Sequence, residues 1–99
     1  MVRNFQVHLP VEHPATLAFE KRSGRGRLVV TGDWTVPEVP RLDSELLRLD
    51  FRGIRDVEID GSGLGHLDSA GAWLLLRTKQ QIEGGGGRVT GFGYPDHYK

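Results

Sequence analysis

The chain has 99 residues and balanced charge, with 13 Lys plus Arg against 13 Asp plus Glu. Its length therefore excludes a large multidomain enzyme, and its charge excludes a net attraction to nucleic acid phosphates. It contains no cysteine, which excludes disulfides, zinc–thiolate sites and thiol catalysis. Because 37% of the residues are hydrophobic, we expect one folded domain over residues 1–99.

No segment predicts insertion into a membrane or contact with nucleic acid. The longest uninterrupted apolar run, residues 72–76, is far shorter than the ~20 residues that span a bilayer, and the N-terminus lacks the apolar core of a signal peptide. The basic run at residues 21–27 has no interleaved aromatic residues, so we interpret it as a solvated turn. Together with the absence of cysteine, the lack of a membrane-spanning segment favours a cytoplasmic protein.

Alternating apolar side chains predict strands in the first third of the chain. Residues 5–9 alternate in this way before two prolines, so the segment 1–12 is interpreted as an extra strand or a linker. Apolar runs at residues 17–19 and 28–31 flank a Ser-Gly-Arg-Gly turn at 23–26. Together they predict a β-hairpin.

The middle of the chain predicts a helix followed by a strand. Apolar residues recur at helical spacing from 39 to 49, with Pro37 and Pro40 at positions that a first turn tolerates. Residues 54–60 then alternate between apolar and acidic side chains, which predicts a strand. We expect this strand to end in a loop at the glycine-rich stretch 61–65.

A second helix is predicted to begin just after Asp68, which can serve as its N-cap, and to end at the four glycines 84–87. Residues 88–92 predict a short strand, and residues 94–99 the start of a truncated final helix. The element order β, β, α, β, α, β predicts an α/β fold, a mixed β-sheet with helices packed on it.

At 100° per residue the second helix has two distinct faces. A core-facing stripe contains Gly71, Leu74, Leu75, Thr78 and Ile82. The opposite face contains Ser69, Trp73, Leu76 and Gln80. Exposed apolar side chains grouped in this way mark protein interfaces. The alternative is that the first or the final helix of the domain covers Trp73 and Leu76.

Residues 57–71, with the sequence VEIDGSGLGHLDSAG, resemble the signature of the STAS domain family. In that signature a strand ends in Asp, a Ser-Gly-apolar loop follows, and Asp-Ser-(Ser or Ala)-Gly opens a helix. By this match the loop residues are Asp60, Ser62 and Gly63. The Gly-Asp turn at 32–33 and the glycine-rich exit at 84–87 also fit the order of STAS elements. The resemblance implies a STAS-like mixed sheet and a non-enzymatic regulatory module without a cofactor.

The resemblance also implies a partner and a switch. In anti-sigma-factor antagonists of this family, an anti-sigma factor kinase phosphorylates the serine directly after the second Asp, and phosphorylation releases the complex. By position that serine is Ser69. The implied partner-binding residues are Asp68, Ser69, Trp73, Leu76 and Gln80. Ala70 stands where antagonists commonly have a second serine, and His66 where they have an apolar or aromatic residue.

A second branch of the family is similar as well. The residues 32–35 and 70–75 resemble STAS domains that regulate Mla-type lipid-trafficking ABC transporters, either as separate subunits or fused ahead of the permease. In that branch the residue at position 69 serves binding to the transporter ATPase. An end at Lys99 would suit a domain excised from a longer chain.

Catalytic and ligand-binding interpretations have less support. His66, Asp68 and Ser69 lie too close in sequence to align as a triad, and the Gly-x-Ser-x-Gly elbow is absent. Asp60 and Asp68 would suit a carboxylate pair, but loop-ending and capping roles explain both. The stretch 61–65 resembles a dinucleotide loop without its third glycine, and the histidines lack metal-ligand spacing. We expect neither an enzyme nor a metal site, and nucleotide or small-ligand binding stays the third alternative.

Overall fold

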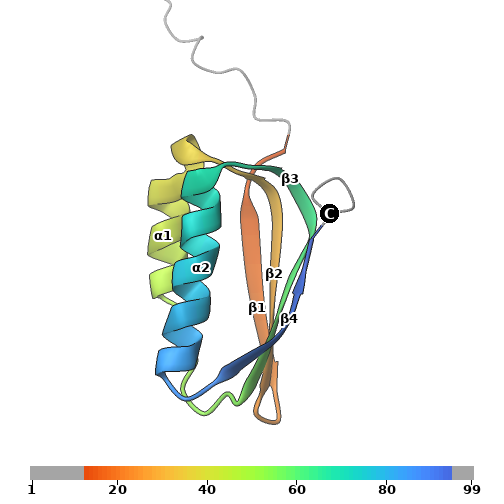
Figure 1. Ribbon diagram of the computed structural model, residues 1–99, viewed down its shortest axis with the longest axis vertical. Helices are drawn as coiled ribbons and strands as arrows, with labels where there is room; N and C mark the ends of the chain where they lie inside the picture. The colour runs from red at the N-terminus through yellow and green to blue at the C-terminus, as the bar shows by residue number, and fades with distance from the viewer. Residues whose placement is uncertain (1–12, 95–99) are drawn as a thin grey trace, which may run out of the picture.

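The computed structural model describes residues 13–94, which form a four-stranded mixed sheet with two helices packed on one face (Figure 1). In chain order the elements are β1 (Thr16–Arg22), β2 (Arg25–Trp34), the 3-10 helix η2 (Val36–Glu38), α1 (Val39–Leu47), β3 (Asp56–Leu67), α2 (Ser69–Gly84) and β4 (Arg88–Gly93). The predicted α/β class and the order of these elements are confirmed. The strand predicted at 5–9 and nearly all of the predicted final helix lie outside the described residues.

The sheet has the strand order β1-β2-β3-β4. Strands β1 and β2 form an antiparallel hairpin, whereas β2 with β3 and β3 with β4 are parallel. Positive φ angles at Ser23 (53°) and Gly24 (78°) fit the tight two-residue turn that a twisted hairpin prefers. Each parallel pair needs a crossover, and α1 and α2 supply them. Because right-handed crossovers that step in one direction across a sheet fall on the same side, both helices cover the same face.

The core lies between this face and the two helices. Its fully buried side chains come from β2, β3, α1 and α2, and include Leu28, Val30, Trp34, Leu42, Leu46, Val57, Ile59, Leu74, Leu75 and Ile82. Each such side chain contributes roughly 1.5–3 kcal/mol of burial free energy. The buried indole of Trp34 keeps a hydrogen-bond partner, since its Nε1 donates to the Thr31 carbonyl at 3.0 Å.

Strand β3 is longer than the sequence predicted, and the loop expected at 61–65 is wrong. Asp60, Ser62 and Gly63 lie inside the strand. Glycines ordinarily signal a turn, but here glycine allows a neighbouring strand to approach closely. A Cβ at Gly63 would lie 2.9 Å from the Thr31 Cγ2 on β2.

The first of two irregularities in the pairing of β3 with β2 keeps β3 amphipathic. Val29 and Thr31 of β2 pair with Asp60 and Gly63 of β3, so three steps on β3 match two on β2. One extra residue reverses which face the following side chains point to. Leu64 therefore lies in the core, 3% exposed, on the same side as the odd-numbered apolar residues earlier in β3.

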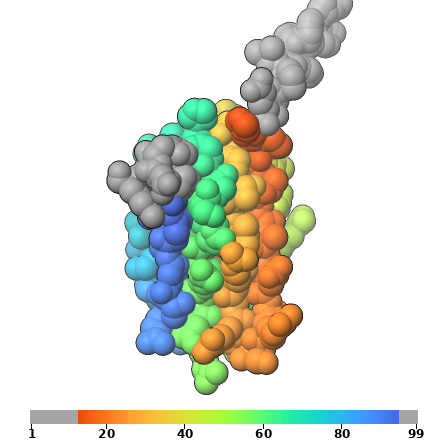
Figure 2. Space-filling view, turned by 90° about the vertical axis from the view of Figure 1, so that its right-hand side faces the viewer, coloured from red at the N-terminus to blue at the C-terminus, as the bar shows by residue number. Residues whose placement is uncertain are grey.

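No helix among the described residues covers the other face of the sheet. Figure 2 looks onto this outer face and shows the four strands side by side. Its exposed side chains are largely charged and include Glu20, Arg25, Arg27, Glu58 and Arg88. Within residues 13–94, no helix is both long enough and apolar enough to cross a membrane.

Candidate functional site

The start of α2 is fixed by Asp68, as its sequence position predicted. Asp68 is the N-cap, and its Oδ1 accepts a hydrogen bond from the Gly71 N–H at 2.9 Å. Its Oδ2 accepts from the Val36 N–H of η2, also at 2.9 Å. These two N–H groups, Gly71 first, hold the pKa of the Asp68 carboxyl below its usual range. Both carboxylate oxygens are thus used to tie α2 to η2, so Asp68 acts first as a structural residue.

Close contact between α2 and the end of β2 depends on Gly71. A Cβ at this position would overlap the Trp34 carbonyl oxygen and lie 2.8 Å from the Trp34 carbonyl carbon. The same carbonyl accepts a hydrogen bond from the Asp68 N–H at 3.4 Å. Glycine at 71 therefore sets how closely the first turn of α2 approaches the sheet.

The outward face of α2 is exposed, as the helix wheel predicted. Trp73 is 56% exposed and Leu76 is 50% exposed, and Ser69 and Gln80 are exposed on the same face. We call these four residues the α2 surface. Within residues 13–94 neither α1 nor another element covers it, and the Ser69 hydroxyl makes no hydrogen bond there. The predicted inward stripe, from Gly71 to Ile82, is buried.

Arg77 is a residue of this site that the sequence interpretation missed. Its guanidinium lies over the Trp73 ring, with Cζ 5.3 Å from the ring centroid, and its Nη1 is 2.5 Å from the Asp43 Oδ1 of α1. Its Nε and Nη2 are buried and make no hydrogen bond within the described part of the chain. The ring face of Trp73 is therefore a neighbour that stabilises this cation. The i, i+4 spacing of Trp73 and Arg77 was the available signal.

An apolar groove continues the α2 surface towards β4. It has a volume of about 260 Å³ and is lined by Leu67, Ala72, Leu75, Leu76, Lys79, Phe92 and Tyr94. The rings of Phe92 and Tyr94 stack with centroids 4.7 Å apart. Leu76 belongs both to the groove and to the α2 surface, so the two form one continuous apolar area. The sequence did not indicate this groove because its residues come from β3, α2, β4 and the position just after β4.

Asp60, Ser62 and Gly63 are not part of this area. Asp60 accepts hydrogen bonds from the Ser62 N–H at 3.0 Å and from the Ser62 hydroxyl at 2.7 Å, and it forms an ion pair with Arg27. The Ser62 hydroxyl, then its N–H, then Arg27 lower the pKa of the Asp60 carboxyl. Seven residues of extended strand, 61–67, lie between Asp60 and Asp68 and hold them roughly 25 Å apart. The two do not form a carboxylate pair.

His66 makes its hydrogen bonds with Asp33 and not with Ser69. Its N–H donates to the Asp33 Oδ1 at 2.9 Å, and its Nδ1 lies 3.2 Å from the same oxygen. The His66 N–H is the main reason why the pKa of the Asp33 carboxyl lies below its usual range. Residues 13–94 contain no group of three or more His, Asp or Glu side chains placed to hold a metal ion.

Comparison with known proteins agrees with this architecture. Residues 17–99 match a family model described as "Mlab, STAS domain". The fold is similar to the crystal structure of an antisigma-factor antagonist, a STAS domain from Rhodobacter sphaeroides, with a TM-score of 0.62 and 21% sequence identity over 80% of this chain and 84% of that one. No curated protein sequence matches the chain significantly.

Proposed function

Because the chain belongs to the STAS domain family, a family of regulatory modules, we propose that it binds a partner protein through the α2 surface and catalyses no reaction itself. One observation carries this proposal: Trp73 and Leu76 are half exposed on the same helix face as Ser69. An exposed tryptophan beside an exposed leucine is the kind of anchor that dominates binding energy at protein interfaces.

The contacts of Trp73 support this role. Arg77 holds the indole from one side and is itself held by Asp43. A ring held in one orientation loses less conformational entropy when a partner covers it. The apolar groove beside Leu76 offers a place for a second anchor from the partner. Gln80 would lie one turn further along, at the polar rim.

We further propose that phosphorylation of Ser69 switches this association off. A phosphate would add about −1.5 to −2 charges at the N-terminus of α2, where the helix dipole favours an anion by ~0.3–1 kcal/mol. The helix would therefore persist. A partner covering Trp73, however, would have to desolvate the new charge, so the complex would dissociate. The partner in this case is an anti-sigma factor kinase.

A second candidate partner is the ATPase of an Mla-type phospholipid ABC transporter. It is favoured by the description of the family model that matches residues 17–99. In that case Ser69 would be a contact residue in a lasting complex, and no kinase would be involved. A nucleotide site, the third alternative, loses its structural basis because the glycines at 61–65 lie within β3.

A pull-down with four matched baits tests these proposals. Wild type, Ser69→Ala and Ser69→Asp are compared with Ser44→Asp, which places the same charge at an exposed serine of α1. Capture of a kinase by wild type, Ser69→Ala and Ser44→Asp, but not by Ser69→Asp, supports the phosphorylation switch. Capture of a transporter ATPase moves the assignment to the second candidate. Equal binding of one partner by Ser69→Asp and wild type would refute the switch.

A further inference from the structure

The cations that lack an ion pair gather at one end of the molecule. Residues 13–94 contain eleven Lys and Arg side chains, and six of them form ion pairs with carboxylates. Four of the remaining five lie on the β1–β2 hairpin and on the segment leading into β3. We call them the basic end: Lys21, Arg22, Arg25 and Arg55.

Backbone hydrogen bonds hold the segments of the basic end together. The Arg55 N–H donates to the Gly24 carbonyl of the hairpin turn at 2.8 Å, and the Arg88 N–H donates to the Arg55 carbonyl at 2.7 Å. The hairpin turn, the start of β3 and the start of β4 are therefore joined by hydrogen bonds at one end of the sheet. All four cations are exposed. The fifth unpaired cation, Arg48, is the first residue of the loop that leads from α1 to β3.

The acidic residues nearby do not neutralise the basic end, because most of them already have partners. Arg52 binds Asp50 at 3.0 Å and holds the pKa of that carboxyl well below its usual range. Arg88 binds Asp56 at 3.2 Å, and Arg27 binds Glu58. Of the described carboxylates at this end, Glu20 alone has no ion pair. Four exposed cations thus face one free carboxylate.

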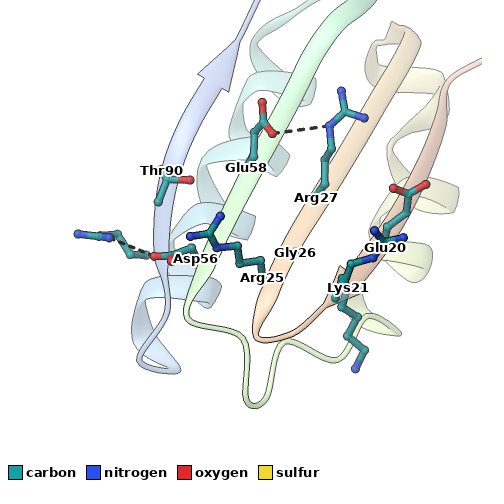
Figure 3. A pocket seen from close by; sticks show the side chains of 10 residues that line it. Glu20, Lys21, Arg25, Gly26, Arg27, Asp56, Glu58 and Thr90 are labelled. Atoms are coloured by element: carbon teal, nitrogen blue, oxygen red, sulfur yellow. Dashed lines mark hydrogen bonds and ion pairs between the residues drawn. The ribbon is translucent and has the colours of Figure 1, made fainter.

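The shape of this region decides which anion fits it. A groove of about 830 Å³ runs from the basic end onto the outer face of the sheet, and Figure 3 shows Glu20, Asp56 and Glu58 along it. In the groove Asp56 is paired with Arg88 and Glu58 with Arg27, so the unpaired positive charge lies at the tip. The aromatic residues nearest the tip, Phe19 and Phe51, pack edge to face at 5.0 Å and are not free to stack on bases, which disfavours single-stranded nucleic acid.

We propose that the basic end docks the domain onto an anionic phospholipid surface, without inserting into it. A tip with several Lys and Arg side chains complements the negative headgroup layer of such a membrane. This proposal does not depend on the α2 surface.

Docking in this way would leave the α2 surface free. Strand β3 starts at Asp56 beside the basic end and ends at Leu67 just before α2, and its twelve residues span roughly 35–40 Å. Ser69 therefore lies at the far end of the sheet from the basic end, facing away from the membrane. A protein bound at α2 would be held near the membrane surface.

Vesicle flotation tests the proposal, with Lys21→Gln and Lys79→Gln as matched variants. Both lose one lysine charge, but Lys79 lies on α2 and pairs with Glu83 at 3.4 Å. On phosphatidylcholine–phosphatidylglycerol vesicles of about 7:3 composition, we expect Lys21→Gln to bind about fivefold more weakly than wild type, and the double variant Arg22→Gln/Arg25→Gln about 25-fold more weakly. Lys79→Gln should bind like wild type, and added salt should release all of them.

Three results would overturn the proposal. The first is that wild type floats no better with anionic vesicles than with pure phosphatidylcholine, and the second is that Lys79→Gln loses as much binding as Lys21→Gln. A duplex DNA oligonucleotide bound more tightly than the vesicles, and with the same dependence on Lys21, would assign the basic end to nucleic acid instead. Thermal unfolding of each variant, monitored by circular dichroism, establishes that all are folded in the comparison.

Discussion

Replacing Gly71 by alanine tests how α2 is held against β2. In a helix the substitution alone gains up to about 1 kcal/mol of helix propensity. At Gly71, however, the new methyl would overlap the Trp34 carbonyl oxygen. A backbone carbonyl cannot rotate away as a side chain does, so the overpacking cost lies at the upper end of its usual range of about 1–3 kcal/mol. We expect Gly71→Ala to lower the free energy of unfolding by about 2 kcal/mol.

Gly84 provides the matched control at the other end of the same helix. A Cβ there would meet nothing within 4 Å, so Gly84→Ala should raise the free energy of unfolding by about 0.5 kcal/mol. Urea unfolding followed by circular dichroism measures both variants. With an m-value near 1–1.5 kcal/mol per M, the two midpoints should differ by roughly 2 M. If Gly71→Ala were as stable as Gly84→Ala, the close contact between α2 and Trp34 would be refuted.

The remaining predictions concern the cap, the α2 surface and the bulged strand. Asp68 has a lowered pKa in the folded state, so its stabilising effect should be complete above the unfolded carboxyl pKa of about 4 and be lost as the pH falls through the folded value. Asp68→Asn, which keeps a capping oxygen, should flatten that part of an unfolding-versus-pH curve; an unchanged curve would contradict the assigned cap. Trp73→Ala should lower the free energy of unfolding by about 1 kcal/mol, the size of the lost contact with Arg77, while weakening partner binding by at least about 2 kcal/mol in titration calorimetry; a loss of stability above about 3 kcal/mol would show that the indole serves the fold. Arg77→Met should shift and broaden the Trp73 indole N–H signal in an NMR spectrum more than Arg77→Lys, because lysine retains a cation near the ring. Equal spectra would refute the contact between Arg77 and the Trp73 ring. Leu64→Ala should cost about 2–5 kcal/mol by thermal or urea unfolding if the side chain is in the core, whereas a cost under about 0.5 kcal/mol would place it outside.

The sequence by itself determined the helices and the exposed face of α2. Helix α2 is amphipathic with a 3.6-residue period, so the positions of Gly71 and Leu74 in the buried stripe and of Trp73 in the exposed one follow from counting residues. The start of α2 follows from Asp68, because a capping side chain accepts a hydrogen bond from a backbone N–H only three residues further along the chain. Strands β1 and β2 follow from alternation around a turn. All of these are local relations, in which each residue's role depends on neighbours a few positions away.

Only the tertiary structure decided the features that join distant segments. The contact between Gly63 and Thr31 depends on the pairing of β3 with β2. The same pairing leaves one extra residue in β3, which places the Leu64 side chain in the core, and neighbouring residues in the sequence do not indicate either feature. The same is true of Arg77, which meets Asp43 only because α1 and α2 pack side by side. The sequence showed the basic run at 21–27, but only the fold brings Arg55 beside it and pairs most of the nearby carboxylates with other cations.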